Sequence, residues 1–311
     1  MTALAMTFWQ RLAENSFYQQ ALVGGLGIAL LCSVLSVFVV LKRMAFIGQG
    51  ISHAAFGGVG AALLAGLAME ALRPVLARDA VVACFCVGAA VVIGALTRRG
   101  KLSEDTAIGI VLVAAMAAGV LLLDVRALWM QHLLDAGALR RQDIGYTPGF
   151  HDILFGNILF ITRGQIVAAW ILAGAVVLAV IAMFKELVFF TFDEETASVF
   201  GVRTSLLYYG LLIALGLAVV AAMRSLGVVL ASALLILPGA SARCWSNRIG
   251  WVTIISAVLG TTALAAGLLL SIYLRYLSPG AVIVLTLCAV FLMSLGARRL
   301  RRRLTTRIES K

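Results

Sequence analysis

The sequence contains few charged residues. Of its 311 residues, 13% are charged and 62% are hydrophobic, whereas about 25% of the residues in ordinary soluble domains are charged. Apolar runs close to the ~20 residues that a membrane helix needs recur along the chain, with no soluble domain between them. The low charge therefore excludes a soluble protein and predicts a single all-α, polytopic membrane domain.

Several chemical motifs are also absent. The five cysteines lie in or beside apolar runs and form neither a disulfide framework nor a zinc-binding spacing, so we interpret them as small packing residues. The phosphate loop G-x-x-x-x-G-K-[ST], the zinc motif H-E-x-x-H and the nucleophile turn G-x-S-x-G do not occur. These absences argue against an ATPase and against an intramembrane enzyme. The first 20 residues lack the pattern of a secretory signal, so we expect no cleavage there.

The basic residues outnumber the acidic ones, giving a net charge of +11. They lie mainly at the ends of apolar runs and in residues 298–307, as expected for cytoplasmic flanks of membrane helices. No nucleic-acid recognition motif accompanies them, so we exclude nucleic acid as a partner. The basic cytoplasmic tail, residues 298–311, is interpreted as a solvated stop signal, with attraction to anionic membrane lipid as the alternative.

Nine apolar stretches approach spanning length. They are residues 17–41, 51–72, 79–97, 106–124, 164–184, 205–222, 226–245, 251–274 and 279–297. Together they predict about eight to nine transmembrane helices in one domain, residues 17–297, after an N-terminal segment of residues 1–16. The basic connections then fall on the cytoplasmic side, and residues 125–162 form an outer-face loop. Within that loop, residues 150–161 are long enough to dip into the membrane, and a re-entrant segment would reduce the count to eight.

The first candidate site lies in residues 41–58, LKRMAFIGQGISHAAFGG, where one apolar run ends and the next begins. It contains His53, one of only three histidines, and a polar side chain in apolar surroundings is costly unless it is paired or bound. Gln49 lies four residues earlier, so a helix would project both side chains from one face. The alternative is that His53 only hydrogen-bonds to a neighbouring helix.

The second candidate site is the charged segment between two apolar runs, residues 185–204. Asp193 is a suitable N-cap for a short helix and Gly201 can end it. Such a helix, in a protein without a cytoplasmic domain, predicts a surface for a partner, with a helix resting on lipid as the alternative.

The third candidate site is the sequence LLILPGASAR near the end of the seventh apolar stretch. Pro238 removes a backbone donor and disfavours helix just before it, and Gly239 loosens the turn that follows. We expect a kink or break there. This kink serves either gating or helix packing, since proline is tolerated in membrane helices in both roles.

Taken together, these motifs and LFGNIL at residues 154–159 resemble the membrane permeases of the manganese, zinc and iron (chelate) branch of ABC importers. The resemblance covers residues 17–295 and implies the fold of the metal-chelate/vitamin-B12 type of permease, in the bacterial cell membrane. It also implies that His53 lines the metal path, with Gln49 at a position where the family has an acidic residue. A final group of residues matches the family's coupling helix: Phe192, Asp193, Glu195, Ala197 and Gly201.

The resemblance implies import of a divalent metal ion, Mn²⁺, Zn²⁺ or Fe²⁺, without a permanently bound cofactor. It further implies three protein partners: an ABC ATPase subunit that uses ATP, an extracytoplasmic metal-binding protein, and a second permease that is either identical or a sibling. The alternative function is a secondary transporter driven by an ion gradient. Such transporters usually place ionisable groups at midmembrane, whereas here the acidic residues lie at the ends of apolar runs and in loops.

Overall fold

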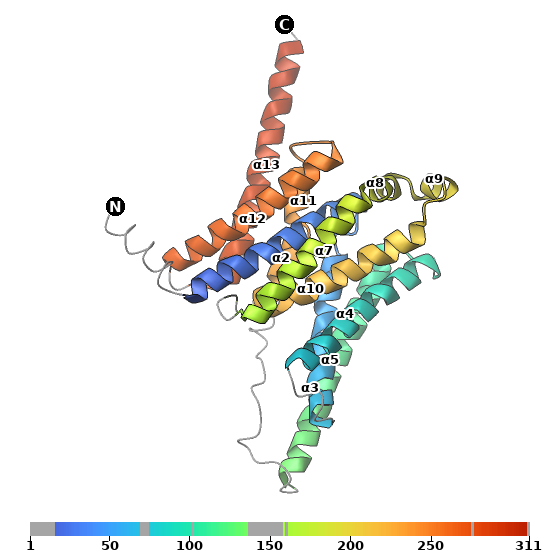
Figure 1. The fold of residues 1–311 in the computed structure, drawn as a ribbon, viewed down its shortest axis with the longest axis vertical. Helices are drawn as coiled ribbons and strands as arrows, with labels where there is room; N and C mark the ends of the chain where they lie inside the picture. The colour runs from blue at the N-terminus through green and yellow to red at the C-terminus, as the bar shows by residue number, and fades with distance from the viewer. Residues whose placement is uncertain are drawn as a thin grey trace.

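The computed structural model describes residues 16–68, 75–100, 102–135, 158, 161–274 and 277–309. Within this part of the chain every regular element is a helix and no strand occurs, which confirms the all-α prediction. The helices, arranged as Figure 1 shows, are α2 (Ser16–Leu41), α3 (Ile47–Ala68), α4 (Val75–Arg98), α5 (Glu104–Asp135), α7 (Arg163–Ala182), α8 (Phe184–Phe192), α9 (Glu194–Val199), α10 (Thr204–Leu234), α11 (Leu237–Ala242), α12 (Ile249–Leu274) and α13 (Pro279–Glu309).

The expected membrane spans correspond to helices. Seven helical segments among the described residues are long and apolar enough to cross a membrane, and α10 and α11 count as one of them. The 22-residue helix α3, which is not among the seven, accounts for the expected stretch 51–72. Two stretches that we predicted as separate spans, 205–222 and 226–245, lie within the single α10–α11 segment.

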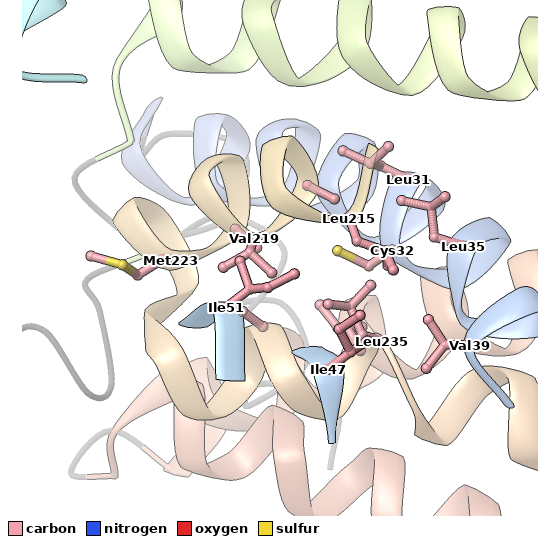
Figure 2. Close-up of a cluster of buried hydrophobic side chains, with 14 of the residues drawn as sticks. Leu31, Cys32, Leu35, Val39, Ile47, Ile51, Leu215, Val219, Met223 and Leu235 are labelled. Carbon is pink, nitrogen blue, oxygen red and sulfur yellow. The ribbon is translucent and has the colours of Figure 1, made fainter. Parts of the chain in front are cut away.

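Gly227 explains this difference. It interrupts α10 with φ of 82° and ψ of 166°, a conformation that is essentially restricted to glycine. Figure 2 shows the chain leading from Leu215 to Met223 and then turning back to Leu235, which lies beside Ile47. Dividing α10 at Gly227 and including α3 gives nine helical segments among the described residues, which is roughly consistent with the predicted eight to nine.

Two helices extend further than the sequence analysis expects. Helix α5 continues through residues 125–135, which we assigned to the outer-face loop, and α13 continues through residues 298–309 of the basic tail. In both places the sequence beyond the apolar run contains no glycine or proline. Because no residue there disfavours a helix strongly, the helical hydrogen bonding continues. Residues 136–157, 159 and 160 lie outside the described residues; they contain most of the rest of the predicted loop, of the LFGNIL motif and of the possible re-entrant stretch 150–161. Residues 1–15 of the predicted N-terminal segment also lie outside the described part of the chain.

Helix α2 lies at the centre of one group of helices. It packs against α7, α10, α11 and α12, and its middle and C-terminal parts are almost completely buried. Ile158 and Ile161 cover its first half at Gly24 and Gly25. A second group consists of α3, α4 and α5 (Figure 1). Helix α10 contacts members of both groups and so connects them.

Small residues allow helices α3 and α5 to approach closely. A Cβ atom on Gly57 would lie 2.8 Å from the backbone oxygen of Ala115, and one on Gly119 would lie 3.0 Å from the Cα atom of Gly57. Close backbone contact of this kind is a main source of attraction between membrane helices, because lipid tails remove the usual hydrophobic driving force. The glycines therefore fix the position of α3 against α5.

A group of buried serines joins α2 to α12. The Ser36 and Ser256 hydroxyls each donate to the backbone oxygen of Ser33 at 2.7 Å, and their own oxygen atoms lie 3.1 Å apart. The Ser256 bond crosses from α12 to α2, whereas the Ser36 bond lies within α2, and a hydrogen bond between membrane helices is worth about 1 kcal/mol. The group also lies beside Gly239, since a Cβ atom at that position would lie 2.7 Å from the backbone oxygen of Ser36.

One ion pair joins helices that belong to the two groups. Arg224 of α10 pairs with Asp79 of α4, and both side chains are partly buried, at 28% and 29% exposure. A lone charge inside an apolar bundle is costly, so each residue compensates the other. The pair adds an electrostatic link to the apolar contacts between α4 and α10.

The contact between Gly239 and Ser36 generates a prediction about stability. We expect Gly239→Ala to destabilise the protein by about 1 to 3 kcal/mol, because the new methyl group meets backbone atoms that cannot rotate away. The control is Gly174→Ala on α7, where no atom lies within 4 Å of the new Cβ; it should stabilise the protein by about 0.5 to 1 kcal/mol. Thermal unfolding of the purified protein in detergent measures both, and equal stabilities would contradict the packing assigned to Gly239.

Candidate functional site

A rigid turn connects α2 to the helix that contains His53. The Met44 N–H donates to the Val39 oxygen at 2.9 Å and the Arg43 N–H donates to the Val40 oxygen at 3.3 Å. Arg43 has a φ of 60°. This is the Schellman motif, in which the left-handed residue is usually glycine. Met44 is 1% exposed and Val39 is fully buried, so an apolar contact anchors the turn.

Gln49 and His53 lie on the open face of α3, as their spacing predicts. Gln49 is exposed and His53 is half-buried. The opposite face is closed, because Ile47 and Ile51 are fully buried and point into the apolar cluster of Figure 2. Within the described part of the chain, neither polar side chain has a hydrogen-bond partner. The interpretation that His53 merely bonds to a neighbouring helix therefore finds no support among these residues.

The donors at this face are too few to enclose a metal ion. Among the described residues, no group of three or more His, Cys, Asp or Glu side chains lies together. Gln49 offers an amide oxygen and His53 an imidazole nitrogen, and imidazole suits several first-row transition metals. Two donors from one chain allow an ion to be held briefly and released.

The cysteines do not add to this site. Cys86 is buried and its Sγ atom lies 3.9 Å from the backbone oxygen of Ile51, whereas Cys84 is exposed. The two side chains thus face different surroundings, as expected for residues two apart on a helix. The burial of Cys86 agrees with its interpretation as a packing residue, whereas the exposure of Cys84 does not support that interpretation.

The charged segment folds into two short helices, α8 and α9, with Asp193 between them. The Asp193 side chain caps α9 by accepting the Thr196 N–H at 2.9 Å, and it also accepts the Thr196 hydroxyl. These hydrogen bonds hold the pKa of the Asp193 carboxyl below its ordinary value. The N-cap predicted from the sequence is therefore confirmed.

The other end of α9 is also as predicted. Gly201 has a φ of 83°, and the Val202 N–H donates to the Ala197 oxygen at 3.0 Å, which closes a second Schellman motif. Ala197 is fully buried beneath the segment. Both ends of α9 are fixed, so the helix holds its shape without a covering domain.

Large apolar side chains project outward from this segment. Phe192, Val199 and Phe200 are 67%, 84% and 75% exposed. Glu195 and Gly201 are exposed beside them. A cluster of exposed apolar groups on a short helix between long spans is typical of a surface that binds another protein.

Glu194 is a residue that the sequence analysis missed. Its carboxylate pairs with Lys42, at the end of α2, at 2.9 Å, and also with Arg98, at the end of α4. These contacts place the two helix ends and α9 at one end of the bundle, as the distribution of basic residues predicts. The sequence did contain one signal of these ion pairs, because it places an acidic residue on the same side of the membrane as two basic helix ends. It did not indicate which basic residues would pair with Glu194.

Pro238 and Gly239 lie at the predicted break. Helix α10 ends at Leu234, α11 begins at Leu237, and Pro238 occupies its first turn. Both Pro238 and Gly239 are buried, and α11 packs against α2, α12 and α13. Their surroundings favour the packing role, and a role in gating stays a prediction.

A bundle of long apolar helices with an outward-facing polar pair and an exposed connecting segment is the architecture expected of a membrane transport permease. The chain belongs to the ABC 3 transport family, whose family model matches residues 14–298. It is therefore a multi-pass membrane protein, and the resemblance drawn from its motifs is confirmed.

Individual relatives agree with this membership. The chain is 31% identical over 297 residues to the manganese transport system membrane protein MntC of Halalkalibacterium halodurans, covering 92% of this chain and 89% of that protein. It is 29% identical over 291 residues to a protein of Haemophilus influenzae named as a probable iron transport system membrane protein, covering 93% and 96%. Among solved structures, PsaBC from Streptococcus pneumoniae in complex with Fab gives a TM-score of 0.74 at 29% identity, covering 93% of this chain and 95% of that chain.

The cap of α9 generates a prediction about local stability. We expect Asp193→Ala to raise amide hydrogen exchange in residues 194–199 by about fivefold, because the first turn loses its side-chain acceptor. Asp193→Asn is the matched control, since asparagine caps helices equally well. Because the pKa of Asp193 is lowered, the wild-type cap stays ionised at neutral pH and weakens only as the pH falls through that lowered pKa. Equal exchange in the alanine and asparagine variants would contradict the assignment.

Proposed function

We propose that this chain is the permease subunit of an ABC importer for a divalent transition metal, Mn²⁺, Zn²⁺ or Fe²⁺. The observation that best supports the proposal is the placement of Gln49 and His53 on the open face of α3 in a chain of the ABC 3 transport family. The names of its relatives, which refer to manganese and to iron transport, support a metal cargo and leave the particular ion open.

The proposed position of the metal path is inferred from the two side chains that can donate to a metal ion. One chain supplies an imidazole and an amide oxygen at the open face of α3, and a second permease facing it would supply another pair. A neutral amide binds a divalent cation more weakly than a carboxylate does, and weak binding suits a conduit because the ion must leave again. We infer that the ion passes between two permeases, identical or sibling, beside His53.

The energy source is proposed to be a separate ATPase subunit, since the sequence contains no phosphate loop. The surface that would bind it is the outward face of the α8–α9 segment, including Phe192, Asp193, Glu195 and Gly201, with buried Ala197 supporting them. An extracytoplasmic metal-binding protein would deliver the ion to the opposite side of the membrane.

The first test measures metal accumulation. Metal-starved cells expressing the chain with its ATPase and binding protein should accumulate one of Mn, Zn or Fe, and His53→Ala should reduce this uptake by about tenfold or more, because the path loses its imidazole. His132→Ala, at an exposed position on α5, is the matched control and should transport normally.

The outcomes of this test separate the hypotheses. Loss of uptake in a variant that lacks ATPase activity supports the importer, whereas uptake that survives this loss supports the gradient-driven alternative. Wild-type uptake in His53→Ala, with normal membrane insertion, would refute the assignment of the path.

The second test concerns the ATPase surface. We expect Glu195→Lys to reduce both transport and co-purification of the ATPase subunit, because the charge of an exposed contact residue is reversed. Asp105→Lys makes the same change at an exposed position at the start of α5 and should leave the complex intact. Unchanged transport and co-purification in Glu195→Lys would count against this surface.

A further inference from the structure

Glu194 occupies a position between the ends of two membrane helices. One oxygen of its carboxylate, Oε2, accepts from the Lys42 ammonium at 2.9 Å, and the other, Oε1, accepts from the Arg98 guanidinium. The partners lie 152 and 96 residues away in the sequence. A single side chain of α9 thus binds the C-terminal ends of α2 and α4 at the same time.

Each cation is also held by an aromatic ring of the surrounding helices. The Lys42 Nζ atom lies 3.6 Å from the centre of the Phe190 ring, and the Arg98 guanidinium lies 4.4 Å from that of Tyr208. Arg98 also donates to the Ser205 hydroxyl at 2.8 Å. Cation–π contacts strengthen when water is partly excluded, so this cluster is more than a solvated surface pair.

Limited solvent exposure supports the same conclusion. The side chains of Lys42, Arg98 and Glu194 are 13%, 24% and 36% exposed. Glu104, at the start of α5, lies near enough to interact electrostatically with both Lys42 and Glu194. Acidic and basic side chains therefore gather at the point where α2, α4, α5 and α9 meet, and salt screens such partly buried charges less than it screens exposed ones.

The residue after Lys42 begins the rigid turn that leads into α3. Arg43 is the left-handed residue of the Schellman motif, buried Met44 anchors it, and the Ile47 N–H donates to the Met44 oxygen at 3.0 Å where α3 starts. Lys42 is therefore joined through this turn to the first turns of α3, which contain Gln49 and His53. The second contact, through Arg98, joins Glu194 to α4, which packs against α3.

We propose that Glu194 is a positioning residue for transport, which transmits movement of α9 to α3 through its contacts with Lys42 and Arg98. This inference rests on the proposed function, because it assigns a mechanical role within ATP-driven import. Glu194 touches neither the metal path nor the outward apolar face, so its role differs from that of His53 and from that of Glu195.

The test measures coupling rather than binding. The complete complex of permease, ATPase and metal-loaded binding protein is reconstituted in lipid vesicles, and metal uptake is divided by ATP hydrolysed. We expect Glu194→Gln to lower this ratio by about tenfold, as expected for the loss of one charge-assisted hydrogen bond, while the ATPase still co-purifies. Asp135→Asn, which neutralises an exposed acid at the opposite end of α5, should leave the ratio unchanged.

A double variant distinguishes transmission from a general loss of structure. If Lys42 and Glu194 act through their shared contact, Lys42→Met with Glu194→Gln should lower the ratio no further than the more severe single variant. Multiplicative losses, a ratio within twofold of wild type in Glu194→Gln, or loss of ATPase co-purification together with a lower melting temperature would each overturn the proposal. If the wild-type complex itself imports none of the three metals, the proposed function fails instead.

Discussion

The cost of placing charge among apolar helices determines much of this structure. A chain with so few charged residues can keep a partly buried charge only where a partner is fixed nearby. Asp79 finds Arg224 within the bundle, and Glu194 finds Lys42 and Arg98 at its end. Because each partner lies on a different helix, these pairs also link helices that are distant in the sequence.

Helix packing follows a second rule, which depends on size rather than charge. Where backbones approach closely, as at Gly57 with Ala115 and at Gly239 with Ser36, any side chain would force the helices apart. The serines beside Gly239 add hydrogen bonds in a medium that offers no water to compete for them. The first helix group therefore combines a directional polar contact with close packing at Gly239, while α3 and α5 depend on shape.

Local features were predictable from the sequence because their causes are local. The cap at Asp193, the end at Gly201, the break before Pro238 and the shared face of Gln49 and His53 depend only on neighbouring residues. The partners of Glu194 were not predictable, because they are set by how distant helices pack. The expected spans 205–222 and 226–245 are separated close to Gly227, but the sequence analysis predicted no interruption at that residue. Many other glycines in apolar runs remain helical, so the conformation of Gly227 could not be told from theirs.

The outward direction of Gln49 and His53 has a consequence for how a metal would be selected. On the proposed function, two neutral donors would form a shallow free-energy minimum, in which an ion keeps part of its water shell and stays only briefly. Such a minimum favours throughput and discriminates poorly among ions of similar size and charge. On the proposed function, the choice of metal would be made before the ion enters the membrane, by the protein that delivers it.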